Sequence, residues 1–428
     1  MNCKSKFFTL FVLLISSLVN LNAGTSEQYQ TCQKSVEKAN EVIWSHFVDK
    51  NDVLLDFVNL DGTISLPTKE EVLLGKPNAL GWWTPIENGA MFGGLYMDGL
   101  IAKWNKTRNK KDASQVKRIA KGLMLLASIS TVEGFVGRGV TEDGKSHYLM
   151  GSNDQTGPWF YGLWKYLQTD LPTKEERIQI EKKLISTATI ICNAGWKMPA
   201  EAPFNYRGSF KNIELAGSAR MLFVMKIMAL MTKDEVWHQR YVKALSEKGG
   251  AENLTRLEAC AKGMFNEGKF KKAWTEINGV IALRGLWEME KDEAIKNEYR
   301  KGLEKSAEIA AESLTLISNF DPSEASVFDT DWRKMNELWQ PQLTEKDAAE
   351  VAKVQLSDFQ KRSPRWTKES KYVREPIFAS YIVALSPNKD YVKSQTPAIM
   401  NVISYFKYDN LYNVWFFPVE AIWWRIQS

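Results

Sequence analysis

The stretch GGLYMDGLIAKWNKTRNKKDASQVKRIAKGLMLLASIST, residues 93–131, contains the two kinds of helix that recur along the chain. Residues 93–104 are apolar on most sides, which is typical of a helix buried on all faces. Residues 114–131 place Val116, Ile119, Leu123 and Leu126 on one face, which indicates an amphipathic helix that covers a core. Together they predict a helical hairpin with one inner and one outer helix.

This alternation continues along the chain. Further helices are predicted over residues 26–48, 158–167, 173–194, 213–231, 235–246, 254–265, 280–290, 294–317, 345–361, 377–385, 392–406 and 411–426. Capping boxes are predicted at Thr68–Glu71 and Thr173–Glu176. No strand pattern is convincing, no fixed repeat period is present, and no Pro/Gly/Ser linker divides the chain. We therefore expect about 12 to 14 helices in one all-α domain, with hairpins closed into a ring.

The first 24 residues have the pattern of an export signal. Lys4 and Lys6 precede an apolar run over 7–18, which is too short to span a bilayer, and the small residues Ala23 and Gly24 follow. We expect cleavage of residues 1–24, a single domain over 25–428, and a periplasmic or secreted protein without a membrane span.

The composition excludes several classes of protein. The net charge is +5, but the charged residues of both signs are interspersed, which disfavours a nucleic-acid binder. Cys32, Cys192 and Cys260 are too few for a disulfide framework, although one bridge is possible. No zinc, calcium or phosphate-binding motif is present, so we expect no cofactor. The sequence does not indicate the oligomeric state.

The segment 134–164 is the loop richest in functional side chains. It is longer than most helix–helix connections, and long loops often carry function. It contains the seven polar candidates Arg138, Asp143, His147, Tyr148, Asn153, Asp154 and Gln155. Long loops recur after roughly every second helix, so we expect them to gather at one end of the molecule.

Two short segments resemble the six-hairpin glycosidase-like proteins, which are (α/α)6 toroids. Gln155, Trp159, Tyr161 and Gly162 resemble the Gln…Trp…Tyr-Gly run on an inner helix of unsaturated glucuronyl hydrolases. The segment GLYMDGL with Asp98 is similar to the acid-bearing inner helix of other bacterial toroid glycosidases. The resemblance implies an (α/α)6 toroid with a carbohydrate cleft at one end, where carboxylates carry out the chemistry.

Glycoside hydrolysis requires a proton donor and a second carboxylate that acts as base or nucleophile. Asp154 is the first candidate for the second role, because a helix N-terminus stabilises an anion; it could equally be a helix cap. Candidate proton donors are Asp98, within an apolar helix, and Glu87, beside two tryptophans. Asp143, followed by glycine, is more typical of a turn.

Other side chains are candidates for proton transfer or substrate binding. His147 can shuttle protons, and Arg138 can bind a uronate or sulfate through two hydrogen bonds. Asn153, Gln155 and Tyr148 lie in segment 134–164, and Arg207 lies in a second long loop, residues 195–210. The rings in long loops are candidates for stacking on sugars: Trp82, Trp83, Trp159, Tyr206, Trp332 and Trp339. Arg365, Trp366 and Arg374 form a further basic and aromatic segment beside Glu375.

The sequence therefore favours an exported glycoside hydrolase that acts on oligo- or polysaccharides, including those with uronic acids. A polysaccharide lyase on the same fold is one alternative, with Arg138, His147, Tyr148 and Asn153 at its site. A glycan-binding protein without activity is another, and so is a helical scaffold with no role in sugar binding. In the first three cases the expected partner is a carbohydrate.

Overall fold

A computed structural model describes residues 27–265 and 272–427. The predicted export signal, residues 1–24, lies outside the described residues. The fold is all-α, with 16 helices in the described part of the chain, and the few strands are short. This number exceeds the expected 12 to 14 because short segments such as α2 (Lys69–Leu73) and α13 (Pro364–Glu369) also form helices, while the predicted helix of residues 254–265 is α9 (Arg256–Lys262).

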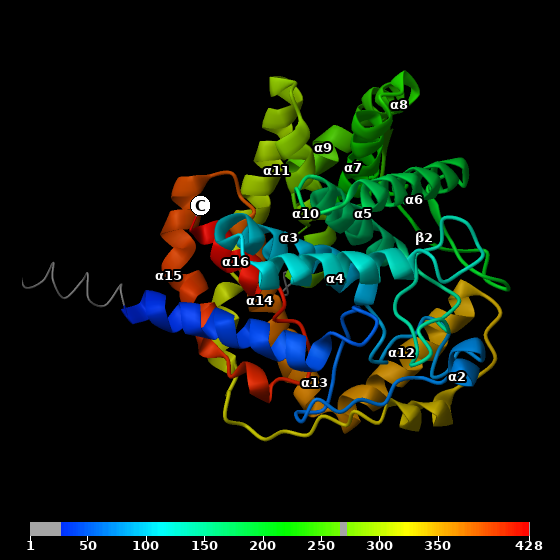
Figure 1. Ribbon diagram of the computed structural model, residues 1–428, viewed down its shortest axis with the longest axis vertical. Coiled ribbons are helices and arrows are strands. Elements are labelled where there is room, and N and C mark those ends of the chain that lie inside the picture. Colours follow the sequence, from blue (N-terminus) through cyan, green and yellow to red (C-terminus); the bar gives the residue numbers. More distant parts are fainter. Residues whose placement is uncertain (1–26, 266–271, 428) are drawn as a thin grey trace, which may run out of the picture.

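Helices that are buried on most faces form the centre of the molecule (Figure 1). They are α3 (Gly89–Thr107), α5 (Asn153–Leu167), α7 (Leu215–Thr232), α10 (Ala273–Met289), α14 (Glu375–Ala384) and α16 (Val419–Ile426). α3 contacts α5 and α16, while α10 contacts α5, α7 and α14, and α14 contacts α16. The contacts α3–α5–α10–α14–α16–α3 therefore form a closed circuit. Apolar side chains on most faces of α3, α7, α10 and α14 explain why these four helices are central.

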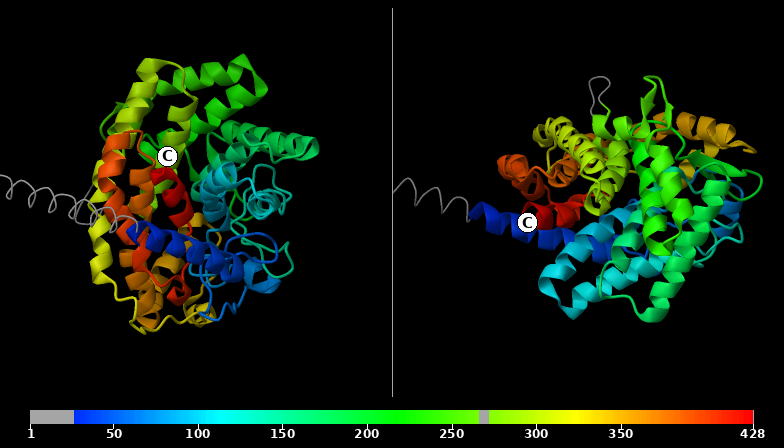
Figure 2. Two further views of the ribbon diagram at one scale, coloured as in Figure 1. Left: turned by 60° about the vertical axis from the view of Figure 1, so that its left-hand side comes forward. Right: turned by 90° about the horizontal axis from the view of Figure 1, so that it is seen from above.

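Amphipathic helices cover this centre. They are residues 27–42, α4 (Lys110–Leu126), α6 (Lys174–Asn193), α8 (Glu235–Leu245), α11 (Glu293–Ala311), α12 (Glu345–Arg362) and α15 (Lys389–Tyr405). α4 packs on α3 and buries Val116, Ile119, Leu123 and Leu126, so the predicted hairpin of residues 93–131 is confirmed. Residues 27–42 lie beside α16, where Tyr29 donates a hydrogen bond to Gln427 (2.7 Å) (Figure 2).

Short irregular elements connect the helices. They are the π-helical turns η1 (Ile43–Phe47) and η4 (Ser370–Arg374), and the 3-10 turns η2 (Leu314–Asn319), η3 (Trp332–Leu338) and η5 (Tyr408–Asn410). Two antiparallel strand pairs also occur, β1 (Lys197–Pro199) with β2 (Tyr206–Ser209) and β3 (Lys248–Gly249) with β4 (Leu254–Thr255). The sequence shows no convincing strand pattern at these positions, because strands of two to four residues are too short to show alternation of polar and apolar residues.

The helix ends both confirm and correct the predictions. Both predicted capping boxes form; in the second, Thr173 accepts from the Glu176 N–H (3.2 Å) and Glu176 accepts from the Thr173 N–H (2.7 Å). α5 begins at Asn153, five residues before Pro158, so Pro158 lies inside the helix rather than in its first turn. α16 begins at Val419 instead of Leu411, because Pro418 at its N-cap marks the end of an irregular buried segment.

α3 and α5 approach each other more closely than ordinary side chains allow. A Cβ atom on Gly94 would lie 2.1 Å from the Pro158 carbonyl oxygen, and one on Gly162 would lie 2.8 Å from Gly94 Cα. Glycine at both positions therefore lets the two backbones touch.

Within the described residues, α7 is the one helix that is long and apolar enough to cross a membrane by length and composition. By length and composition alone, this helix differs from the expectation of a protein without a membrane span. However, 67% of this stretch is buried inside the protein, as in a core helix. The three cysteines of the described residues, Cys32, Cys192 and Cys260, are unpaired.

Candidate functional site

A cavity of about 250 Å³ lies where the loops before α3 and α16 meet α10, α12 and α13. We call it the tryptophan cavity. Its aromatic lining consists of Phe57, Trp82, Trp83, Trp274, Phe359, Trp366 and Trp415. Its polar lining consists of Asp56, Glu87, Asn88, Arg374 and Asn413. The cavity therefore combines a broad apolar surface with two carboxyl groups and one guanidinium group.

Two loops that are distant in sequence fix the position of Asp56. Phe57 forms an isolated β-bridge with Asn413, and the Val414 N–H donates to the Asp56 carbonyl oxygen (3.0 Å). The Asp56 N–H donates to the Pro85 carbonyl oxygen (2.8 Å). Asp56 is thus held by its backbone against both the loop before α3 and the loop before α16.

Asp56 and Glu87 form a pair of interacting carboxyl groups. Both oxygens of Asp56 accept from Asn88, one from its backbone N–H and one from its side-chain amide, each at 2.7 Å. Glu87 accepts from the Trp83 N–H (2.8 Å). Burial, and next the charge of Glu87, raise the pKa of Asp56 well above its ordinary value. Burial also raises the pKa of Glu87, although the nearby Arg138 and Arg374 oppose this effect.

Arg138 and Gln155 contact the residues that carry or hold these two carboxyl groups. Arg138 donates to the carbonyl oxygens of Glu87 (3.0 Å) and Met150 (3.3 Å), and burial lowers its pKa to about 10. The Gln155 side-chain amide donates to Asn88 Oδ1 (3.0 Å), on the residue that holds Asp56. Both are candidates from the sequence, and the structure places them outside the lining of the tryptophan cavity, in contact with the residues that carry its carboxyl groups.

Trp83 has a backbone conformation that is unusual for a bulky residue. Its φ is +69°, in the left-handed region, which non-glycine residues seldom adopt. The bond from its N–H to Glu87 and the bond from its Nε1 to the Ala352 carbonyl oxygen (3.0 Å) maintain this conformation. Its ring stacks on Phe359, with centroids 5.7 Å apart, and meets Trp366 edge-on at 5.8 Å. Strained residues of this kind cluster at functional sites.

Arg374 completes the lining from the turn before α14. Its guanidinium carbon lies over the rings of Trp274 and Trp415, at 4.6 and 4.7 Å from their centroids. Its nearest ion-pair partner is Glu375, with 3.7 Å between Nε and Oε1. Burial lowers the pKa of Arg374 to about 10.

The structure places Asp98 in a buried ion pair away from this cavity. Its carboxylate receives two bonds of 2.7 Å from Arg425, as well as bonds from the hydroxyls of Tyr161 (2.9 Å) and Tyr381 (2.8 Å). Burial opposes ionisation, but the charge of Arg425 lowers the pKa of Asp98. The arrangement holds α3, α5, α14 and α16 together.

The remaining polar candidates of segment 134–164 do not line the tryptophan cavity. Asp154, in the first turn of α5, has a side chain that is 55% exposed and lies 3.3 Å from Arg220. His147 contacts the Lys145 carbonyl oxygen and Glu201, and Tyr148 donates to the Lys76 carbonyl oxygen. The Asn153 amide donates to the Ser209 carbonyl oxygen (3.1 Å). Each of these side chains therefore has a partner outside the tryptophan cavity.

The other residues that the sequence predicted as site candidates also have partners outside the tryptophan cavity. Asp143 accepts from the N–H groups of Lys145 and Ser146, which is a turn as expected. Trp159 and Trp332 are buried, and their Nε1 groups donate to carbonyl oxygens of Leu123 and Ser65. The Nε1 group of Trp339 donates to the Gly75 carbonyl oxygen, and Arg207 pairs with Glu345. Tyr206 is 43% exposed, with Lys197 over its ring.

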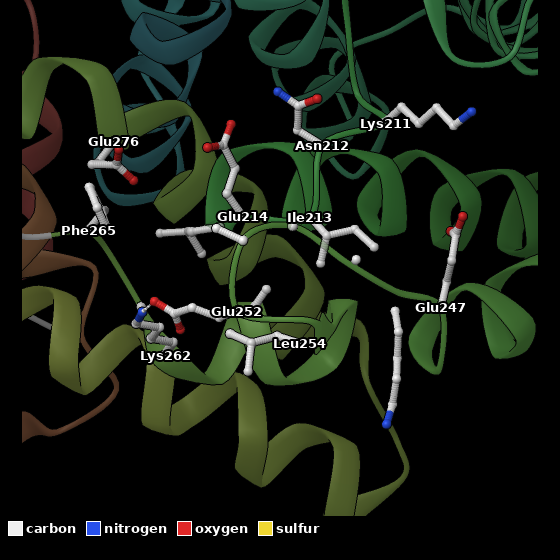
Figure 3. A pocket seen from close by; sticks show the side chains of 17 residues that line it. Lys211, Asn212, Ile213, Glu214, Glu247, Glu252, Leu254, Lys262, Phe265 and Glu276 are labelled. Carbon is white, nitrogen blue, oxygen red and sulfur yellow. Dashed lines mark hydrogen bonds and ion pairs between the residues drawn. The ribbon is translucent and has the colours of Figure 1, made fainter.

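A second, larger cavity of about 640 Å³ lies near the N-terminal ends of α7 and α10 (Figure 3). Glu214 and Glu276 both line it, and burial followed by the charge of Glu214 raises the pKa of Glu276 to about 7. Phe265 is the one aromatic ring of its described lining. It therefore lacks the extended ring surface that accompanies the carboxyl pair in the tryptophan cavity.

No protein-family description, no curated protein sequence and no solved structure matches this chain. The site is therefore defined by its own chemistry. Of its lining residues, Trp82, Trp83 and Glu87 are candidates from the sequence, and Trp366 and Arg374 belong to the basic and aromatic segment. Asp56, Trp274 and Trp415 were missed. For Asp56 a signal exists, since it is the one charged residue in the apolar run VLLDFV, 53–58.

Proposed function

We propose that this protein is a glycoside hydrolase whose active site is the tryptophan cavity, with Asp56 and Glu87 as its catalytic carboxyl groups. The observation that carries the proposal is that these two interacting carboxyl groups lie in a cavity with aromatic walls. The predicted export signal supports action outside the cytoplasm, in the periplasm or after secretion.

The arrangement of the helices supports an (α/α)6 toroid. The buried helices contact one another in a closed circuit, and amphipathic helices cover them. The tryptophan cavity lies near the N-terminal ends of α3, α10, α14 and α16, because Asn88, Arg374 and Trp415 come shortly before three of these helices and Trp274 is the second residue of α10. A site at one end of a helical ring is also what the resemblance to toroid glycosidases implies.

The two carboxyl groups differ in the way that hydrolysis requires. Burial and the charge of Glu87 raise the pKa of Asp56, which favours the protonated form that can donate a proton to the leaving glycosidic oxygen. Glu87 lies near Arg138 and Arg374, which favour its carboxylate form. Glu87 then either removes a proton from the attacking water or attacks the sugar carbon directly as the C–O bond breaks.

The aromatic lining supports a sugar as substrate. Pyranose rings have apolar C–H faces, and indole rings offer large, rigid surfaces that bury such faces. Trp83 and Trp366 are only partly buried, although they belong to a packed aromatic cluster. Rings that remain accessible within a cavity can stack on a ligand without unfolding the cluster.

The test compares three variants that each replace one carboxyl group by its amide. Glu87→Gln and Asp56→Asn should each lower turnover of a cleaved glycan by about a hundredfold or more, as loss of an acid or base group does. Asp154→Asn is the matched control and should retain near-normal turnover, because Asp154 lies outside the cavity. Reducing-end release from a panel of neutral and acidic glycans is the measurement, with thermal unfolding as the check on folding.

Three results would reject this proposal. Full activity of Glu87→Gln together with loss of activity in Asp154→Asn would move the site to segment 134–164. Products with ultraviolet absorbance from a new C=C bond would identify a lyase instead. Glycan binding without any product would identify a binding protein.

A further inference from the structure

The guanidinium group of Arg374 has a hydrogen-bond donor beside the tryptophan cavity that no described residue uses. Its Nε atom is buried and has no hydrogen-bond partner within the described residues. Its guanidinium carbon also lies over the rings of Trp274 and Trp415, which limit the directions from which a hydrogen-bond acceptor can approach its N–H groups. Arg374 also lines the tryptophan cavity. Buried polar groups normally have partners, so an arginine whose buried Nε has none among the described residues requires an explanation.

We propose that Arg374 binds an anionic substituent of the substrate, a carboxylate or a sulfate group. Either group has paired oxygens that match the fork of N–H donors on a guanidinium group. The inference rests on the proposed function, because it assigns the substrate of that same cavity to the acidic sugars. Of the cavity's lining residues, Arg374 is the one with a cationic side chain.

The described acidic groups near Arg374 do not occupy its Nε donor with a hydrogen bond. Glu375 is 3.7 Å from Arg374 Nε, which is longer than a hydrogen bond, and Glu375 also interacts with the first backbone amides of α10. Glu87 and Asp56 are the other acidic residues near Arg374 in the cavity. The raised pKa of Asp56 limits the negative charge there, so the cavity is less repulsive to an anion than two full charges would make it.

A purely structural role for Arg374 predicts different behaviour. If it served only to pack between two tryptophans, its replacement would lower stability and would weaken neutral and anionic sugars equally. If it binds an anion, replacement weakens the anionic sugars selectively. Discrimination between matched sugars therefore separates the two roles.

The experiment is titration of the intrinsic tryptophan fluorescence of the full chain with single sugars. Glucuronate and glucose 6-sulfate are the anionic probes, and glucose is the neutral probe of the same ring. We expect wild-type protein to bind at least one anionic probe about tenfold to a hundredfold more tightly than glucose, as hydrogen bonds to charged groups imply. The two anionic probes decide between carboxylate and sulfate.

Two variants complete the test. Arg374→Met should remove this preference while glucose binding changes less than about twofold, and Arg374→Lys should keep part of it because the charge remains without the fork. Equal binding of all three sugars by wild-type protein, binding of none, or an unchanged preference in Arg374→Met would overturn the inference. If the preference depends on Arg374 but Glu87→Gln and wild-type protein both cleave nothing, the hydrolase proposal fails and this inference stands.

Discussion

Removal of the Asp98 carboxylate should destabilise the protein strongly without acting on the tryptophan cavity. Asp98→Asn keeps the size of the side chain but replaces one oxygen by an amide that cannot accept. At present both oxygens accept from Arg425, and each also accepts from one tyrosine hydroxyl. The variant would turn a donor toward the guanidinium or hydroxyl donors that now contact the replaced oxygen.

The magnitude follows from the burial of the partners. Asp98 and the side chain of Arg425 are 4% and 14% exposed, so loss of the carboxylate leaves a mostly buried positive charge without its counter-ion. Breaking a buried pair by removing one partner costs about 3–5 kcal/mol. The lowered pKa of Asp98 means that the ion pair stabilises the protein above the carboxyl's unfolded-state pKa, and that this contribution decreases as the pH falls toward the folded-state value.

Urea unfolding of four proteins measures the effect: wild type, Asp98→Asn, Arg425→Met and the double variant. We expect each single change to lower the free energy of unfolding by about 3 kcal/mol or more. The double variant should lose at least about 1 kcal/mol less than the sum, because it removes both charges. A loss below about 1 kcal/mol for Asp98→Asn, or strict additivity, would refute the argument from burial.

Two further predictions concern packing and pH. Gly94→Ala should lower the free energy of unfolding by about 3 kcal/mol or more, since the new Cβ would lie 2.1 Å from the Pro158 carbonyl oxygen. The control Gly195→Ala should lower it by about 1 kcal/mol, because that position has a positive φ but open space around it. Equal unfolding temperatures of the two variants would contradict this prediction. The second concerns Glu276, whose pKa is raised from 4.5 to about 7, so its protonated form contributes stability that is complete below pH 4.5 and lost as the pH rises through 7. The free energy of unfolding of Glu276→Gln should therefore rise relative to that of wild type as the pH increases from 5 to 8, by at most about 3 kcal/mol. If urea unfolding gives a difference between the two proteins that does not change with pH, the prediction is wrong.

The helices were largely predictable, because their signal is local. The apolar stripe of residues 114–131 and the capping box at Thr173 each depend on residues within a few turns, and both occur as expected. The failures also have local causes. Residues 411–418 are apolar enough to resemble a helix, but they form an irregular buried segment that Pro418 ends.

The tryptophan cavity was predictable only in part. Trp82, Trp83 and Glu87 are neighbours in sequence, so their proximity to one another is visible without a structure. Asp56 and Trp415 join them through contacts between distant segments, and no sequence spacing reports such contacts. Asp98 shows the converse, since an acid in an apolar helix indicates that a partner exists but not that the partner is Arg425.

The bond between the Val414 N–H and the Asp56 carbonyl oxygen has a consequence for biosynthesis. A growing chain contains Asp56 and Glu87 long before it contains Trp415, and domains generally complete their folding as units. Until the loop before α16 emerges from the ribosome, one wall of the cavity is missing and nothing holds Asp56 on that side. The cavity is therefore incomplete for most of the protein's synthesis, and a ligand that needs both walls could bind there only after residue 415 has emerged from the ribosome.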